Sequence, residues 1–472
     1  MGPLPRKSLQ KMSLLLLLAF SSGAPPYGPP GQFLSRVRPV IGSKVFDVTS
    51  SQYGAVGDNR TDDTKALQCA LDDCAKSGDG GVVLLPGKAS NTEADGLVFL
   101  SYPLFLDDAT GCAIVLAPRA TLFAKAWTGP APPVAPTPRS AAARQRRVDL
   151  LRHGSTTQAG ESLSTHVSFL NIDNCHSCAI GGGGTIDGNG PAWWFNRSAP
   201  RPKLIDIDHS RDFALWNFTA TDGGDHTIEL GADDVEVAHM EIVMNWVKAR
   251  PPPGRLGGIM APNTDGIDIH GTPFYVHHTH IDVGDDNIAV HASDVLVEDC
   301  HFGGDVVGHG EPHGHGASIG SVGGGTKLQN ISFRRIVFEN THVGPNIKIH
   351  GDATDGYVRD VVYEDLVITN AALENLLIHT DYGDEGQLAA PTPPTSGDSS
   401  SAFVVSNVLY KNITARGTSK QGGFSCSEKV RCENITMIDV HTDGKPESYV
   451  CNYTTGSAKD VTPPIPCLHS DS

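Results

Sequence analysis

The sequence predicts an all-β protein, a right-handed parallel β-helix with a short N-terminal capping helix. Short β-rich runs recur along the chain, and a second run follows the first by eight residues in three coils, starting at Val235, Phe274 and Val295. Two or more strands in each repeat of about 20 to 40 residues are typical of a right-handed parallel solenoid. An all-β sandwich, the main alternative, would show shorter spacing and no such repeated strand pairs.

The N-terminus has the features of a secretory signal peptide over residues 1–24. A basic segment with Arg6, Lys7 and Lys11 precedes an apolar core from Met12 to Phe20, and small residues follow. A membrane anchor is disfavoured because about 20 apolar residues are needed to cross a bilayer. A Pro/Gly-rich leader follows at 25–43, and we expect one β-helix domain over 44–472.

The first expected element of this domain is a helix over 64–75. Its apolar residues recur at helical spacing, and Asp62 or Asp63 could cap its N-terminus. The open end of a solenoid needs such a cover, because the terminal coil otherwise exposes its core.

Strands are expected from about residue 82 onward. The predicted runs are 82–85, 113–116, 167–170, 227–230, 266–270, 287–291, 317–321, 346–350 and 375–379. Loop insertions near 125–165 and 248–262 interrupt the rhythm. The second insertion immediately precedes Asp265, so we expect it to wall a cleft. The basic run 144–147 is interpreted as a surface loop rather than a processing site.

Composition narrows the function classes. The net charge of −17 disfavours nucleic-acid binding. The negative net charge does not exclude an anionic polymer as the substrate, since cationic residues can be concentrated in a cleft. Seven Asn-x-Ser/Thr sites fit a secreted glycoprotein.

Ten cysteines, an even number, suit an oxidising compartment. Cys175-His176-Ser177-Cys178 resembles half a zinc site, but no second pair with zinc spacing follows, so a disulfide or free thiols are favoured. Local pairing predicts Cys69–Cys74, Cys175–Cys178, Cys426–Cys432 and Cys451–Cys467, with Cys112 and Cys300 left over, paired or free.

Three aspartates and a histidine occupy related places in consecutive predicted coils. Asp265 lies in Asn-Thr-Asp-Gly, Asp285 and Asp286 follow 20 residues later in Gly-Asp-Asp, and His315 comes 30 residues after Asp285 in Gly-His-Gly. Equivalent positions of neighbouring coils stack about 4.8 Å apart, so these side chains would meet on one surface. Clustered carboxyls beside a histidine are what acid/base cleavage of a glycosidic bond requires.

Neighbouring residues of a strand face opposite ways, so Asp285 and Asp286 can both reach a cleft only at a bend, which Gly284 permits. Gly-Asp-Asp alone would more often be a surface turn. His309 and His313 lie close to His315, but only His315 precedes a Ser-Ile-Gly-Ser strand. A histidine-cluster metal site is a minor alternative, because the spacing is wrong for helix-borne zinc.

Two further residues continue the column. Lys348 follows His315 by 33 residues, and Tyr382 follows by 34 more. The column from Asp265 to Tyr382 would cover about five coils, or roughly 20 Å, which is a groove for a polymer. Trp193 and Trp194 could stack on sugar rings, but packing inside an early coil is favoured.

These segments resemble glycoside hydrolase family 28, the polygalacturonases and related pectinases. The resemblance runs from about residue 45 to 438, and the order and gaps of the motifs agree as well as the motifs do. It is carried by Asn263-Thr264-Asp265-Gly266, Gly284-Asp285-Asp286, Gly314-His315-Gly316 with Ser318-Ile319-Gly320-Ser321, and Asn346-Ile347-Lys348, and more weakly by 185–190 with Trp193-Trp194 and by Asp381-Tyr382.

The resemblance implies a secreted, inverting, metal-independent hydrolase of α-1,4 galacturonosyl linkages in pectin. It implies a monomer that needs no cofactor and whose partner is its pectic polysaccharide substrate.

 The chain is thereby expected to have no nucleic-acid partner and no membrane association once the signal is removed. Asp285 matches the general acid, while Asp265 and Asp286 match the residues that hold and deprotonate the attacking water. His315 matches a residue that orients or tunes the acid.

The same resemblance assigns substrate contacts to Asn263, Asn346, Lys348 and Tyr382. In the family an arginine stands two residues before the lysine, and both bind a galacturonate carboxylate beside the scissile bond. Asn346 cannot make the bidentate charged contact of arginine. A second departure is Asn287, where the family often has cysteine.

Asn346 motivates alternative substrates, such as xylogalacturonan or another decorated pectin. A catalytically silent carbohydrate-binding β-helix is a second alternative, which the three aspartates disfavour. A pectate lyase is a third, but β-elimination would need a calcium-bound substrate and an arginine-type base. The sequence is compatible with endo- and with exo-cleavage.

Overall fold

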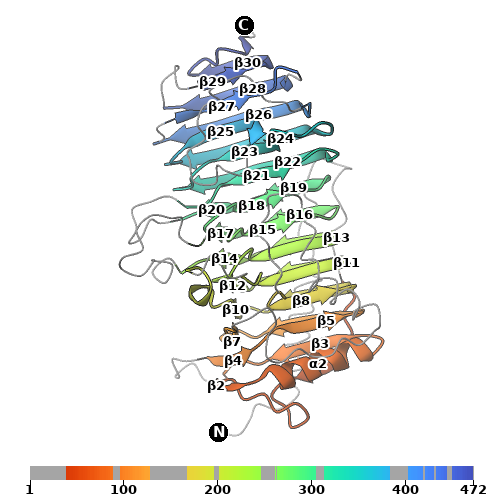
Figure 1. The fold of residues 1–472 in the computed structure, drawn as a ribbon. Coiled ribbons are helices and arrows are strands. Elements are labelled where there is room, and N and C mark those ends of the chain that lie inside the picture. The colour runs from red at the N-terminus through yellow and green to blue at the C-terminus, as the bar shows by residue number, and fades with distance from the viewer. Residues whose placement is uncertain are drawn as a thin grey trace.

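The computed structural model describes residues 39–88, 96–127, 167–195, 201–245, 261, 263–304, 313–382, 402–417, 420–429, 432–443 and 449–470. Within these segments the chain winds into stacked coils along one axis, from the N-terminal helix at one end to β30 at the other (Figure 1). The predicted signal peptide, most of the leader, the run 144–147, His309 and most of both predicted insertions lie outside the described residues.

The strands stack in three columns of parallel pairs. Column A, which carries the candidate site, contains β5 (Leu104–Asp107), β8 (Leu170–Asp173), β15 (Ile267–Ile269), β18 (Ile288–Val290), β21 (Ala317–Val322), β23 (Pro345–His350), β25 (Glu374–Tyr382), β27 (Lys420–Ser425) and β29 (Tyr449–Asn452). Column B contains β1 (Val45–Asp47), β3 (Gly81–Leu85), β6 (Cys112–Leu116), β9 (His176–Gly181), β16 (Phe274–His277) and β19 (Val295–Glu298). Column C contains β2 (Asp58–Asp62), β4 (Leu97–Ser101), β7 (Ala120–Ala124), β10 (Thr185–Asp187), β12 (Thr219–Thr221), β14 (Glu241–Val243), β17 (His280–Asp282) and β20 (His301–Gly303).

Longer strands turn the corners between columns. β11 (Ile205–Trp216) and β13 (Ile228–Ala238) run from column A into column B. Column B continues into column C within β22 (Lys327–Glu339), β24 (Tyr357–Thr369), β26 (Val404–Arg416), β28 (Cys432–Thr442) and β30 (Thr454–Thr462), and β31 (His469–Ser470) pairs with β30.

The predicted capping helix is confirmed as α2 (Thr64–Lys76), and a short 3-10 turn, η1 (Gly190–Ala192), follows β10. Asp63 is the N-cap residue, but its carboxylate accepts bonds from the loop amides of Val56 and Gly57. Asp62 instead accepts the Thr64 amide at 3.0 Å. None of the helices in the described part of the chain has the length and hydropathy needed to span a membrane.

Most predicted strands lie within one to two residues of their expected starts, and Phe274 and Val295 are the first residues of β16 and β19. The strand expected at 167–170 lies three residues later in the structure, since β8 covers Leu170–Asp173. The reason is the register of column A, in which Leu170 pairs with Leu104 and with Ile205.

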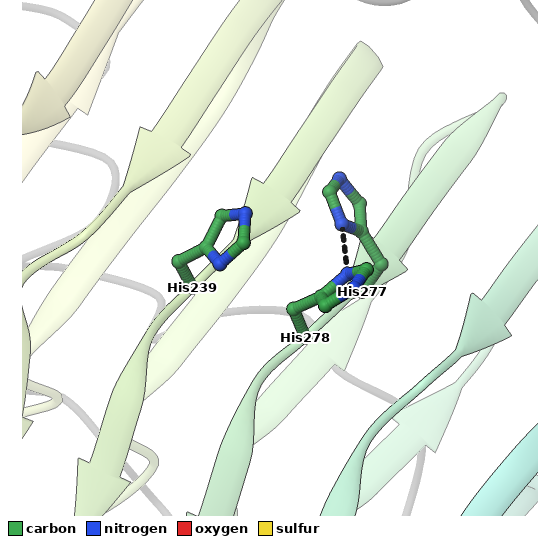
Figure 2. Close-up of side chains that lie close together, drawn as sticks. All are labelled: His239, His277 and His278. Atoms are coloured by element: carbon green, nitrogen blue, oxygen red, sulfur yellow. Dashed lines mark hydrogen bonds between the residues drawn. The ribbon is translucent and has the colours of Figure 1, made fainter. Parts of the chain in front are cut away.

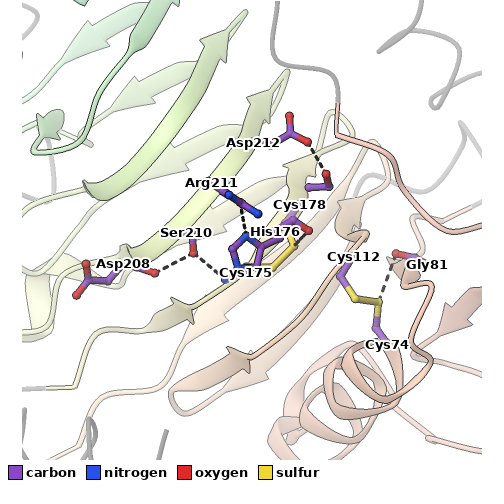
Figure 3. The surroundings of a disulfide bond; sticks show 11 residues. Cys74, Gly81, Cys112, Cys175, His176, Cys178, Asp208, Ser210, Arg211 and Asp212 are labelled. Carbon is purple, nitrogen blue, oxygen red and sulfur yellow. Dashed lines mark hydrogen bonds between the residues drawn. A yellow bond between two sulfur atoms is a disulfide. The ribbon is translucent and has the colours of Figure 1, made fainter. Parts of the chain in front are cut away.

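Four disulfides are present, three of them closing short loops. The predicted pairs Cys175–Cys178, Cys426–Cys432 and Cys451–Cys467 are present. The predicted pair Cys69–Cys74 is wrong: Cys74 faces the solenoid and joins Cys112, which ties α2 to β6 (Figure 3). Cys69 lies on the exposed face of the helix, and Cys300 is a buried free thiol.

The core is a set of inward-facing ladders, in which equivalent residues of successive coils stack. In column B the rings of Phe333 and Tyr363 are 5.1 Å apart, and those of Tyr363 and Tyr410 are 5.2 Å apart. Both tyrosines are fully buried, and neither hydroxyl has a hydrogen-bond partner among the described residues. Stacking of the rings therefore stabilises the fold, whereas burial of the two unpaired hydroxyls costs free energy.

Tyr363→Phe keeps the ring and removes the unpaired hydroxyl, whose burial costs about 1–3 kcal/mol. We expect the free energy of unfolding to stay equal or rise, whereas Tyr363→Ala should lower it by about 3–5 kcal/mol. Guanidinium unfolding of both variants beside the wild type measures the difference. An equal loss in both variants would show that the hydroxyl is paired.

Candidate active site

The three aspartates lie in turns that lead into column A. Asp265 precedes β15, while Asp285 and Asp286 occupy the bend before β18. Hydrogen bonds join the two turns: the Gly266 amide donates to the Asp286 carbonyl at 2.9 Å, and the Gly284 amide donates to the Thr264 hydroxyl at 3.2 Å. The predicted bend and the predicted meeting of the aspartates on adjacent coils are both found.

Glycines let these turns approach one another. A Cβ on Gly266 would lie 2.5 Å from the Asn287 carbonyl oxygen. Gly314 has φ +82, and a Cβ there would lie 2.6 Å from the Asn287 side-chain oxygen. Asn287 uses this proximity, since its oxygen accepts from the Gly316 amide at 2.9 Å and its amide donates to the Ile281 carbonyl at 2.8 Å. It therefore fastens the Asp285 turn to the His315 turn by hydrogen bonds.

His315 reaches Asp285 as the sequence predicts. Its backbone amide donates to the Asp285 carbonyl at 2.9 Å, and its Nδ1 lies 2.9 Å from Asp285 Oδ1. The other carboxylate oxygen accepts from the Asn263 amide at 3.1 Å. His313 points elsewhere, with its Nδ1 2.7 Å from Asp282. Asp285 is thus oriented from both sides.

Asp286 is bound by two side chains from later coils. Ser318 Oγ donates to its Oδ1 at 2.7 Å, and Lys348 Nζ donates to its Oδ2. Asp286 is 3% exposed and Lys348 is 7% exposed, so this ion pair is buried. Charges from the turn before β18 and from β23, two coils apart, therefore meet directly.

Asp265 is surrounded by residues that the sequence analysis did not identify. His226 Nε2 lies 3.7 Å from its carboxylate, and His226 Nδ1 lies 3.4 Å from Asp268 and 3.2 Å from Glu229. Lys203 pairs with Glu229. A usable signal was present in Gly266-Ile267-Asp268-Ile269, because the acidic residue alternates with apolar ones and so faces the same side as the site.

The register makes a single ladder across the outer face of column A. Glu229 pairs with Asp268, Asp268 with Ala289, and Ala289 with Ser318. Ser318 then pairs with Asn346. The outward positions of five successive coils thus form a strip that is polar except at Ala289, with the catalytic candidates along one edge.

Burial and charge set the protonation of this cluster. Burial, with the charges of Asp285 and Asp268, raises the pKa of Asp265 well above its ordinary range, although His226 opposes the rise. Burial also raises the pKa of Asp268 to about 7. Burial would raise the pKa of Asp285 too, but the charge and hydrogen bond of His315 and the charge of Lys348 hold it below its ordinary value.

The two histidines beside the aspartates carry protons readily. Burial lowers the pKa of His315, but the charge and hydrogen bond of Asp285 outweigh burial and raise it overall. Asp268 and Asp265 likewise raise the pKa of His226 against burial. In the free site Asp265, His226 and His315 therefore hold their protons to higher pH than these side chains ordinarily do.

The predicted substrate residues divide into two groups. Lys348 and Tyr382 lie together, with Nζ 5.6 Å from the centre of the ring. Asn263 accepts a hydrogen bond from Arg201 at 3.2 Å, and Arg201 also pairs with Asp225. Asn346 is 4% exposed, and its side-chain oxygen has no hydrogen-bond partner among the described residues.

Trp193 and Trp194 pack within the molecule, as favoured above. They are 6% and 2% exposed; Trp193 contacts Trp127 edge to face, and Trp194 Nε1 donates to the Gly223 carbonyl at 2.7 Å. They stabilise the coil before β11 and leave the ladder of column A as the polar surface of the site.

The chain belongs to a known family. The model of glycosyl hydrolases family 28 matches residues 141–461, which is more than half of the chain. This range contains the turns of Asp265, Asp285 and His315 together with β23 and β25. The protein is therefore a glycoside hydrolase of this family, as its motifs predicted.

Relatives and solved structures agree with this membership. The Arabidopsis thaliana protein "Probable polygalacturonase At3g15720" is 24% identical over 438 residues, covering 90% of this chain and 81% of that protein. "Probable rhamnogalacturonase E" of Aspergillus flavus is 24% identical over 437 residues, covering 89% and 76%. The crystal structure of a hyperthermoactive exopolygalacturonase from Thermotoga maritima is similar with a TM-score of 0.68 at 18% identity, covering 91% and 93%. The structural likeness confirms the right-handed parallel β-helix.

The raised pKa values predict how stability depends on pH. Asp265 and Asp268 bind protons in the folded chain that the unfolded chain releases above about pH 4, and His226 retains its proton above pH 6.5. At these three groups the folded state binds more protons than the unfolded state, so their contribution to stability should fall as pH rises from about 4 through 7. Asp268→Asn should flatten this fall by up to about 1.4 kcal/mol per pH unit.

Guanidinium midpoints from pH 4 to 8 measure this slope. Asp299→Asn is the control, because the hydrogen bond from Arg335 lowers the pKa of Asp299 and its contribution is lost only as pH falls. Parallel curves for the wild type and Asp268→Asn would contradict the assignment.

Proposed function

We propose that this protein is a secreted, inverting hydrolase of α-1,4 galacturonosyl linkages in pectin or polygalacturonate. The carrying observation is the contact network of the site: Asp285 against His315, Asp286 against Lys348, and Asp265 against His226. Three carboxyls, each beside a different cation, can be held in different protonation states at one pH. Family membership supports the same reaction class.

Asp285 is the proposed general acid. Asp285 and His315 together hold a transferable proton across their 2.9 Å contact. As the bond between C1 and the glycosidic oxygen breaks, this proton passes through Asp285 to the leaving oxygen, which becomes a hydroxyl. The pair titrates as a unit, so the low pKa of Asp285 in the free site is compatible with this role.

Asp265 and Asp286 are the proposed partners of the attacking water. Their carboxylates orient it toward C1 from the side opposite the leaving group, and one of them takes its proton. Asp286 is held in place by Ser318 and Lys348, which leaves its orientation fixed. C1 exchanges its bond to the glycosidic oxygen for a bond to the water oxygen. The proton taken from water passes to solvent, and Asp285 with His315 is reprotonated before the next cycle.

The substrate is proposed from Lys348 and Tyr382. Burial lowers the pKa of Lys348, but Asp286, Tyr382 and Asp285 outweigh burial and raise it, so that the side chain stays cationic. A substrate carboxylate beside the scissile bond would share this cation with Asp286, while Tyr382 contacts the sugar. The elongated ladder of column A suits a polymer.

A decorated pectin, such as xylogalacturonan, is the second candidate because of Asn346. Its unpaired buried oxygen accepts hydrogen bonds, whereas the arginine of the family pattern donates two to a carboxylate. This favours a sugar that presents a hydroxyl at that position. Secretion is proposed from the signal-like residues 1–24, and the four disulfides fit an oxidising compartment.

Reducing-end release from polygalacturonate and from xylogalacturonan tests the activity. We expect the wild type to hydrolyse at least one of them, and Asp285→Asn to lower kcat about 10²- to 10⁴-fold, because it removes the proposed proton donor. Release from xylogalacturonan alone would select the second candidate. Ultraviolet absorbance from unsaturated products would show a lyase, and binding without release would show a silent carbohydrate-binding protein.

His226→Gln tests the proposed base. His226 lowers the pKa of Asp265, so its loss should raise that pKa further and move the acidic limb of kcat/KM to higher pH. The pH profile of the variant beside the wild type measures this shift. His209→Gln is the control, because this exposed histidine contacts Asp173 and not Asp265. An unmoved acidic limb would exclude Asp265 as the group that controls it.

A further inference from the structure

Three histidines gather at the corner between columns B and C, away from the proposed catalytic turns. His239 follows β13, His277 is the last residue of β16, and His278 follows it (Figure 2). One nitrogen of each ring lies within 4.8 Å of the others. The catalytic candidates lie instead in the turns that lead from column C into column A, so this is a separate place in each coil.

The stacking of the coils brings the histidines together. Ala238 pairs with His277, and the His239 amide donates to the His277 carbonyl at 3.2 Å. His239 and His278 therefore occupy equivalent corner positions of adjacent coils, and both have a left-handed backbone, with φ 54 and φ 50. Several other coils place asparagine or aspartate in this conformation, as at Asn217, Asp299 and Asn412, and one places Arg335 there. Histidine on two successive coils puts two imidazoles side by side where the corner needs only a small polar residue.

The hydrogen bonds define which nitrogen of His277 carries the lone pair. His277 Nε2 lies 3.0 Å from a carboxylate oxygen of Glu236, which only accepts, so the neutral ring carries its hydrogen on Nε2. His277 Nδ1 then presents its lone pair to His278 Nδ1, 2.8 Å away. A metal-binding histidine characteristically donates its other N–H to a carboxylate in this way.

The neighbouring side chains hold the rings in place. Tyr275 stacks on His277 with ring centres 4.4 Å apart, and Trp216 contacts His239 edge to face at 4.5 Å. Glu236, in β13, is 7% exposed and supplies a buried negative charge beside the rings.

We propose that His239, His277 and His278 form a binding site for a divalent transition-metal ion of the zinc type. Three imidazoles with an open fourth position suit tetrahedral Zn²⁺, whose bonds to nitrogen are about 2.0–2.1 Å long. Such bonds put the ligand nitrogens about 3.3 Å apart, so the 2.8 Å contact of His277 and His278 opens slightly and His239 moves inward. The ion replaces the proton shared between the two Nδ1 atoms.

The site would tie together two coils next to the catalytic turns. His277 and His278 lie in the coil that runs from Asp265 to Asp285, and His239 belongs to the coil before it. A bound ion therefore cross-links adjacent coils by side chains, in addition to their backbone hydrogen bonds. Because only the folded chain assembles the three ligands, binding stabilises it by mass action.

Metal titration of the full-length, untagged protein tests the proposal. After removal of metal with a chelator, calorimetry with Zn²⁺ should show one equivalent bound, and Co²⁺ should give the visible bands of a tetrahedral site. His239→Asn and His278→Asn should each abolish this step. Asparagine is chosen because it accepts the left-handed backbone, as at Asn217 and Asn412, so that folding is retained.

Two further variants separate this site from other sources of binding. Glu236→Gln should weaken Zn²⁺ binding about 10- to 100-fold while leaving the three ligands in place. His209→Asn is the matched control, since His209 is an exposed histidine with φ 47 and should leave binding unchanged. The proposal would be overturned if the wild type bound no Zn²⁺ or if binding persisted in His278→Asn. It would also be overturned if binding were lost in His270→Gln, because His270 belongs to a different group with Asp268 and His291.

Discussion

Parallel backbone pairing between successive coils is the constraint on which the rest of the structure depends. One backbone hydrogen bond between adjacent coils fixes each catalytic turn. The amides of Thr227, Gly266 and His315 donate to the carbonyls of Asp265, Asp286 and Asp285, respectively. Because each coil repeats the direction of its neighbour, residues distant in sequence become adjacent at the spacing of the strands. A one-residue slip in any coil would turn its outward side chains into the core.

This geometry makes like charges unavoidable, and the protein places cations between them. His226, His315 and Lys348 come from three different coils, and each faces a different aspartate. Burial strengthens these interactions, since water is excluded, and it spreads the protonation of the carboxyls over a wide range. The histidine corner follows from the same repetition on another edge, where two equivalent positions carry imidazoles.

Much of this could be predicted from sequence, and the failures have physical causes. The motifs at Asp265, Asp285 and His315 placed the site because a solenoid converts sequence spacing into stacking. His226 was missed because it lies one coil earlier, before a strand whose register to β15 is set only by tertiary pairing. Cys69–Cys74 was wrong because proximity in sequence does not say which face of a helix a cysteine occupies. The histidine trio was missed because it requires the register of β13 with β16.

The stereochemistry of the first product tests the central claim most directly, namely that the stacked aspartates activate water instead of forming a covalent intermediate. Proton NMR during the first minutes of hydrolysis, before mutarotation, reports the anomer released from an α-linked galacturonan or decorated galacturonan. The account predicts the β anomer, by inversion. Initial release of the α anomer would show retention, and one carboxylate would then be a nucleophile.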